Sequence, residues 1–204
     1  MCIRDSVERT QSGFFVPGGQ AYRSPGRVRV EGDWSGAAFW LAANALGSRV
    51  EVEGLNPASA QGDRAAAELF SRLGRVDVRD VPDLMPALAA VMAAVPGEHE
   101  IVGAARLRIK ESDRLFAMES VLNALGADVR ATPDGLRIRG RALEGGHVDG
   151  FGDHRVVMSC AIAATACRNS VVIDGAEAAD KSYPAFFEDF TALGGKCDVQ
   201  HVGE

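Results

Sequence analysis

The stretch Arg108-Ile-Lys-Glu-Ser-Asp-Arg114 lies between an apolar run, 100–104, and an apolar-periodic segment that begins at Leu115. This order predicts that the charged residues lie where a strand ends and a helix begins. Free N–H groups and the helix dipole both favour anions at such a junction. Ser112 or Asp113 is expected to cap the helix. The alternative is that these charges are only caps and solvated surface, which is common at helix starts.

The order of elements around this stretch recurs three times along the chain. An aspartate (Asp33, Asp83 or Asp153) precedes an apolar helix, and a Leu-Gly pair (73–74, 125–126 or 193–194) ends a second helix. The spacing from Asp to Leu, by subtraction of residue numbers, is 40, 42 and 40 residues. Three matching spacings indicate an internal repeat of the form strand–helix–strand–helix–strand–strand. The sequence therefore predicts an α/β fold of repeated βαβαββ units.

Periodicity and turn residues give the expected limits of these elements. The segment 14–22 is typical of a strand end followed by a turn. Helices are expected over 37–46, 61–73, 84–95, 115–125, 154–167 and 184–193, and strands over 28–30, 50–55, 76–78, 99–102, 127–131, 136–139, 171–174 and 196–199.

Composition excludes several classes of protein. The 204 residues are 47% hydrophobic, with no apolar run of the roughly 20 residues that a membrane span needs. A net charge of -6 argues against a general nucleic-acid surface, and no Gly-rich phosphate loop indicates ATP use. The four cysteines lack metal-ligand spacing, so Cys160 and Cys167 are expected to be core thiols in the reducing cytoplasm.

Three further places carry candidate site residues. Asp83 precedes a strongly apolar helix, where it could be an N-cap, a ligand for a substrate hydroxyl, or both. His154 and Arg155 lie in the first turn of a helix, where an imidazole and a guanidinium can bind an anion. Lys181 precedes the second helix of the third unit, the position that Lys110 holds in the second. Alone, each could be a surface residue.

Taken together, several motifs resemble the 5-enolpyruvylshikimate-3-phosphate (EPSP) synthase family of enolpyruvyl transferases. The resemblance covers nearly the whole chain from about Phe14 onward. It rests on Lys110-Glu-Ser-Asp-Arg-Leu115, Leu125-Gly-Ala-Asp-Val129, Asp134-Gly-Leu136, Asp153-His-Arg155, Val30-Glu-Gly-Asp-Trp-Ser35, Gln61-Gly-Asp63 and Pro82-Asp-Leu84.

The resemblance implies a two-domain enzyme in which each domain has three βαβαββ units in a pseudo-threefold arrangement. This chain would be about the C-terminal half. Residues 1–26 would be a leader, with 1–6 fitting no element, and the remnant of an interdomain strand. Residues 27–204 would be one domain, with units over about 27–80, 81–146 and 147–204. Between Leu73-Gly74 and Pro82-Asp83 the first unit has only one short strand, 76–78, where the family usually has a longer two-strand segment, which predicts an open sheet edge.

The family reaction moves the enolpyruvyl group of phosphoenolpyruvate to the 5-hydroxyl of shikimate 3-phosphate, in the shikimate pathway of aromatic amino acid biosynthesis. It uses no metal or organic cofactor. The resemblance gives Asp83, Lys110 and Glu111 catalytic roles. The substrate-binding residues would be Arg114 and Arg155 on the phosphoenolpyruvate carboxylate, Lys181 on its phosphate, and His154 beside them.

Three hypotheses follow. The chain is half of the synthase, inactive without a complementary N-terminal half; or a module that binds small anions without turnover; or a structural fragment whose site forms only with its other half. The residues alone predict that Lys110, Arg114, Arg155 and Lys181 converge on one pocket with Glu111 at its wall.

Overall fold

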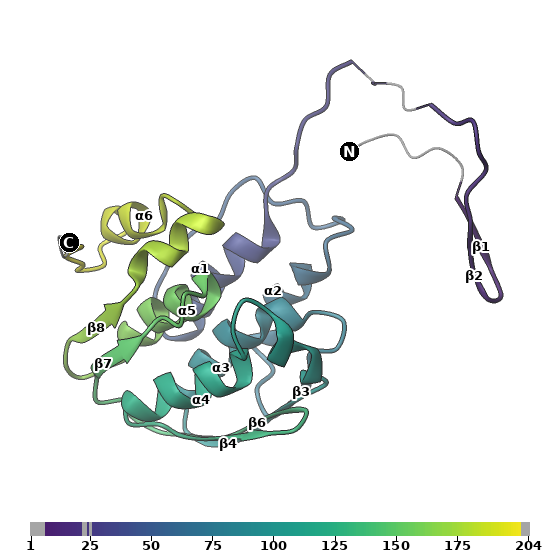
Figure 1. Ribbon diagram of the computed structural model, residues 1–204. Coiled ribbons are helices and arrows are strands. Elements are labelled where there is room, and N and C mark those ends of the chain that lie inside the picture. The colour runs from purple at the N-terminus through teal and green to yellow at the C-terminus, as the bar shows by residue number, and fades with distance from the viewer. Residues whose placement is uncertain (1–6, 22–23, 25, 201–204) are drawn as a thin grey trace. The chain divides into compact units, whose positions relative to one another are not determined.

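The computed structural model describes residues 7–21, 24 and 26–200, in two compact units that meet at Gly32 and Asp33. In the first unit, β1 (Glu8–Thr10) and β2 (Gly13–Phe15) form an antiparallel hairpin (Figure 1). The strand expected over 28–30 is absent from the described residues, and Val30 is 85% exposed. That prediction was wrong, since alternating apolar residues form a strand only where a partner ladder exists. The leader segment 1–6 lies outside the described residues.

The second unit carries the predicted helices in order, with 3₁₀ turns (η) before several of them, and also a strand, Gly146–Asp149, that was not predicted. The first repeat gives α1 (Trp34–Ala45), η1 (Gly62–Ala65), α2 (Ala66–Leu69) and β3 (Arg75–Asp77). The second repeat gives η2 (Pro82–Leu84), α3 (Met85–Ala94), β4 (Gly97–Val102), η3 (Ala105–Ile109), α4 (Arg114–Ala124), β5 (Asp128–Thr132) and β6 (Gly135–Gly140). The third gives β7 (Gly146–Asp149), α5 (His154–Ala164), β8 (Val171–Asp174), η4 (Ala176–Lys181) and α6 (Phe186–Ala192).

Two sheets cover the outside of this unit. The larger has the order β3-β4-β6-β5, with β3 parallel to β4 and the other pairs antiparallel. The smaller is the parallel pair β7-β8. β3 lies at an edge of the larger sheet, as the short first unit predicted. The strands expected over 50–55 in the first repeat and over 196–199 in the third are not formed, whereas those expected in the second repeat are.

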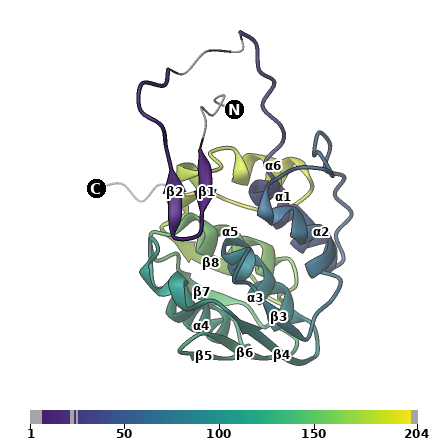
Figure 2. The ribbon, with the colours of Figure 1, turned by 90° about the vertical axis from the view of Figure 1, so that its right-hand side faces the viewer.

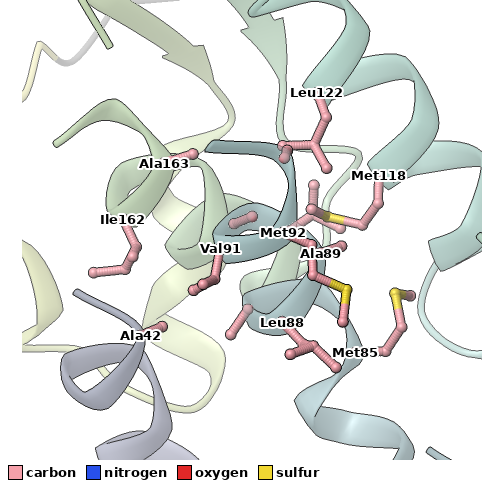
Figure 3. Packing of buried hydrophobic residues seen from close by; sticks show 14 of the residues in the cluster. Ala42, Met85, Leu88, Ala89, Val91, Met92, Met118, Leu122, Ile162 and Ala163 are labelled. Atoms are coloured by element: carbon pink, nitrogen blue, oxygen red, sulfur yellow. The ribbon is translucent and has the colours of Figure 1, made fainter. Parts of the chain in front are cut away.

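The core lies between three helices that each open a repeat: α1, α3 and α5 pack against one another (Figures 1 and 2). Every residue from Met85 to Ala93 in α3 is buried, so this helix is apolar on all sides. Its four buried alanines allow the neighbouring helices to approach closely. Figure 3 shows Leu88 and Met92 of α3 among side chains from α1, α4 and α5. The pseudo-threefold core is thus built from one helix per unit.

Aspartates cap the helices as predicted, with one exception. Asp33 accepts hydrogen bonds from two backbone N–H groups of α1, and Asp113 does the same for α4. Asp153 accepts one from α5. Asp83 lies inside η2, and α3 begins after it without a side-chain cap. The N-cap interpretation of Asp83 was therefore wrong, and its carboxylate is available for other contacts.

The loop after β4 is fastened to the β5–β6 hairpin. Gly103 turns this loop with φ +75°, and a Cβ there would lie 2.1 Å from Asp77 Oδ1. The two carboxylate oxygens of Asp134 accept from the N–H groups of Gly103 and Ala105, each at 3.0 Å. These bonds lower the pKa of Asp134. The predicted Asp134-Gly135 turn thus holds the segment that leads to Lys110.

Candidate functional site

The seven predicted site residues lie in or next to five elements of the second unit, η2, η3, α4, α5 and η4. Asp83 is in η2, Lys110 directly follows η3, and Glu111 precedes α4. The structure brings these elements together, although up to 98 residue numbers separate them. Arg114 opens α4, His154 and Arg155 open α5, and Lys181 ends η4.

Arg114 is the centre of the cluster. Its Nε donates to Asp153 Oδ2 at 2.8 Å, Nη1 to Asp83 Oδ1 at 2.9 Å, and Nη2 to Glu111 Oε2 at 2.7 Å. The side chain is only 1% exposed, and the three carboxylates raise its pKa against the effect of burial. Its donors therefore face protein carboxylates rather than solvent. The expected clamp on a substrate carboxylate would require one of these bonds to be exchanged.

Glu111 connects Arg114 to Lys181. Lys181 Nζ donates to Glu111 Oε1 at 3.0 Å, and the lysine side chain is 56% exposed. Burial alone would raise the pKa of Glu111, but the hydrogen bond from Lys181 and the charges of both cations lower it to about 2. Glu111 is therefore ionised at neutral pH, and an anion that engaged Lys181 would remove one of its two partners.

Asp83 lies next to the other two cations, Lys110 and Arg155. Lys110 Nζ lies 3.6 Å from Asp83 Oδ1, and Arg155 Nη2 lies 3.7 Å from Oδ2. Arg155 Nη1 also donates to the carbonyl oxygen of Asp83 at 3.1 Å. All four predicted cations thus contact Asp83, Glu111 or both. A single pocket shared by all four stays a prediction.

His154 lies behind this cluster, with its side chain 7% exposed. Its Nδ1 is 3.8 Å from Asp153 Oδ1 and has no hydrogen-bond partner among the described residues. Burial lowers the pKa of His154; the charges of Arg155 and Arg114 lower it further, whereas Asp153 opposes the shift. Together these effects favour the neutral form of the imidazole.

An open cleft of about 470 Å³ begins at Asp83 and Lys110 and extends toward the first repeat. Carboxylates and hydrogen-bonding groups dominate its walls, which suits a polar ligand with hydroxyl groups. Ser35 Oγ donates to the carboxylate of Asp63 within it. The lining residues are Ser35, Gln61, Gly62, Asp63, Asp80, Pro82, Asp83, Arg106 and Lys110.

Sequence analysis missed two residues of the cluster. Asp153 was treated only as a helix cap, but it is fully buried and also binds Arg114. Ser112 Oγ donates to Asp153 Oδ2 at 3.0 Å. The position of Asp153 directly before the candidate site residues His154 and Arg155 could have indicated a role in the site. No sequence pattern, however, shows that a capping residue is buried.

Neither a metal centre nor a membrane helix is indicated by the described residues. They contain no group of three or more His, Cys, Asp or Glu side chains that could hold a metal ion. None of their helices is long and apolar enough to cross a membrane. Cys160 is buried, as expected of a core thiol, and Cys167 is half-buried.

Repeated α/β units around a three-helix core, with cations and carboxylates gathered at the helix starts, define a domain of the enolpyruvyl transferase fold. A solved EPSP synthase from Acinetobacter baumannii superposes with a TM-score of 0.81 over 96% of this chain and 53% of that chain, at 24% identity. The family described as EPSP synthase (3-phosphoshikimate 1-carboxyvinyltransferase) matches residues 5–75 and 71–190. The chain belongs to the EPSP synthase family.

Curated relatives agree with this assignment. The 3-phosphoshikimate 1-carboxyvinyltransferase of Clostridium acetobutylicum is 41% identical over 94% of this chain and 49% of its own length. That of Clostridium kluyveri is 41% identical over 100% of this chain and 52% of its own length. The chain spans about half the length of the curated relatives it matches.

Proposed function

We propose that this chain supplies the phosphoenolpyruvate side of an active site that transfers an enolpyruvyl group to the 5-hydroxyl of shikimate 3-phosphate. The observation that carries the proposal is the convergence of four cations on Asp83 and Glu111. Phosphoenolpyruvate offers a planar carboxylate and a phosphate, which match a guanidinium and an ammonium. We place the reaction in the cytoplasm.

Each side chain has a role that suits its surroundings. Arg155 binds the substrate carboxylate, with Arg114 behind it, and the exposed amino group of Lys181 binds the phosphate. Lys110, beside Asp83 at the cleft, contacts the shikimate hydroxyls together with that carboxylate. His154, neutral and buried, supports the first turn of α5.

The reaction moves protons at two places, the 5-hydroxyl oxygen and C3, and the site has one carboxylate for each. In the addition step the 5-hydroxyl oxygen bonds to C2 of phosphoenolpyruvate, its proton passes to Asp83, and a proton from Glu111 enters C3. In the elimination step C3 returns a proton to Glu111, the C2=C3 double bond re-forms as the C2–O bond to phosphate breaks, and the departing phosphate takes the proton that Asp83 received from the hydroxyl. Binding of the phosphate to Lys181 withdraws a partner from Glu111, which allows the carboxyl to take up the proton it must donate.

We propose that turnover also requires a complementary N-terminal half, because the curated relatives are about twice as long as this chain. The test has two arms. Calorimetry should detect phosphoenolpyruvate binding to this chain alone, and phosphate release should appear only when shikimate 3-phosphate and the N-terminal half of a relative are added. Absence of binding would overturn the site assignment, and turnover by the chain alone would overturn the need for a partner.

A second candidate, an anion-binding module without turnover, is favoured by the same cations. It predicts phosphoenolpyruvate binding in the first arm and no phosphate release in the second. The carboxylates distinguish the two candidates, because a site built only to bind anions would not place Glu111 against two of its four cations.

A further inference from the structure

Asp153 serves two purposes at once. Its Oδ1 accepts from the backbone N–H of Arg155 at 3.0 Å, which caps α5. Its carboxylate also accepts from Arg114 Nε at 2.8 Å, Arg114 Nη2 at 3.2 Å and Ser112 Oγ at 3.0 Å. Three of these four bonds lead away from α5, to the segment that opens α4. The residue is therefore more strongly connected to the site than to its own helix.

Helix capping does not explain why this carboxylate is buried. Asp33 caps α1 through two backbone N–H groups while remaining exposed. Asp113 caps α4 in the same way and is only half-buried. Removing a carboxylate from water is costly unless charged partners compensate. Asp153, at 0% exposure, is compensated by Arg114, so the pair forms a buried unit.

Because Asp153 holds the Arg114 side chain in place, Arg114 can hold the two carboxylates of the proposed mechanism, Asp83 and Glu111. A guanidinium is planar, so fixing its Nε and Nη2 edge also fixes the direction of Nη1. Nη1 holds Asp83 at 2.9 Å, and Nη2 holds Glu111 at 2.7 Å. We infer that Asp153 is a positioning residue, which orients Asp83 and Glu111 through Arg114. This inference rests on the proposed function for the roles of those two carboxylates.

A purely electrostatic role for Asp153 makes the opposite prediction about ligand binding. The cluster contains four cations and three carboxylates, so its formal charge is one positive. Neutralising Asp153 would make it two positive, and Coulomb attraction alone would then tighten the binding of an anion. Loss of positioning would weaken it instead. The sign of the change therefore separates the two roles.

The experiment compares Asp153→Asn with Asp113→Asn, since both replace a capping carboxylate and asparagine is itself a good cap. The first readout is the Arg114 Nε–H resonance in NMR spectra, assigned by its disappearance in Arg114→Lys. This proton should exchange slowly with solvent in the parent chain and in Asp113→Asn. In Asp153→Asn it should exchange rapidly. The second is phosphoenolpyruvate binding by calorimetry, where we expect a roughly tenfold higher Kd for Asp153→Asn and less than a twofold change for Asp113→Asn.

A protected Arg114 signal in Asp153→Asn, or equal or tighter binding by that variant, would overturn the inference. Should Asp153→Asn fail to fold, Ser112→Ala replaces it, because this change removes one bond to Asp153 without altering any charge. It should speed exchange of the Arg114 Nε–H, and unchanged exchange would count against the inference. If the parent chain binds no phosphoenolpyruvate, the proposed function fails, and the Arg114 signal still decides whether Asp153 positions that side chain.

Discussion

The first and third repeats begin with the same helix cap, but the two capping aspartates lie in different environments. Asp33 and Asp153 each cap the opening helix of a repeat. Asp33 is exposed beside a cleft lined by polar and acidic side chains, whereas Asp153 is buried against Arg114. The local signal is therefore shared, and the environment depends on which segments pack against the helix start. The first repeat supplies polar walls of the cleft, whereas the third, together with the second, supplies the cluster of cations and carboxylates around Arg114.

The largest effect should come from removing the cation that the third repeat depends on. Arg114→Met leaves the buried Asp153, together with Asp83 and Glu111, without their shared partner. Breaking a buried ion pair in this way costs about 3–5 kcal/mol. Urea unfolding will measure it, with Arg108→Met as the matched control, because Arg108 pairs with a half-exposed carboxylate of Asp113. Equal losses in the two variants would contradict the special status of the buried cluster.

Loss of an exposed cation should affect binding rather than folding. Lys181→Met removes a 56%-exposed side chain, so the free energy of unfolding should change by less than about 1 kcal/mol. Phosphoenolpyruvate binding should weaken at least roughly tenfold, and binding to the parent chain should weaken as salt is added. Lys196→Met, at an exposed position near the end of the described chain, is the control. Unaltered affinity in Lys181→Met would show that the phosphate binds elsewhere.

Removing the helix cap of the first repeat should lower the stability of the chain without changing ligand binding. Asp33→Ala removes the acceptor for two N–H groups of α1, which should cost about 1 kcal/mol. Because Asp33 makes these bonds within its own helix start, we expect phosphoenolpyruvate affinity to stay within about twofold. A change in affinity as large as that of the third-repeat variants would erase the distinction between the two repeats.

The stability of the folded chain should also depend on pH through Glu111. The pKa of Glu111 is lowered to about 2 in the folded chain, against 4.5 as the ordinary value. A lowered pKa means that its contribution to stability is complete above pH 4.5 and is lost as pH falls toward 2. Glu111→Gln should therefore flatten the dependence of the unfolding free energy on pH between these limits. Glu98→Gln, on an 81%-exposed side chain, should leave the dependence as it was.

The sequence was sufficient for features that depend on near neighbours. The repeat spacing identified the order of the helices, and Asp33 and Asp113 cap as their positions predicted. The strands expected over 28–30 and 50–55 are not formed, because alternation of apolar and polar residues cannot show whether a partner strand is present. The second role of Asp153 was also out of reach, since its partner Arg114 is 39 positions away in the chain.

The bonds between Asp134 and the loop after β4 have a consequence for how the family can vary. The tip of a two-stranded hairpin is ordinarily a tolerant place for extra residues. Here the tip carries the acceptors for Gly103 and Ala105, and that loop leads within a few residues to Lys110. Lengthening the tip would shift the lysine away from Asp83 without touching either side chain. Insertions between β5 and β6 should therefore be scarce among active relatives, and an engineered insertion of two glycines there should lower affinity while the core remains folded.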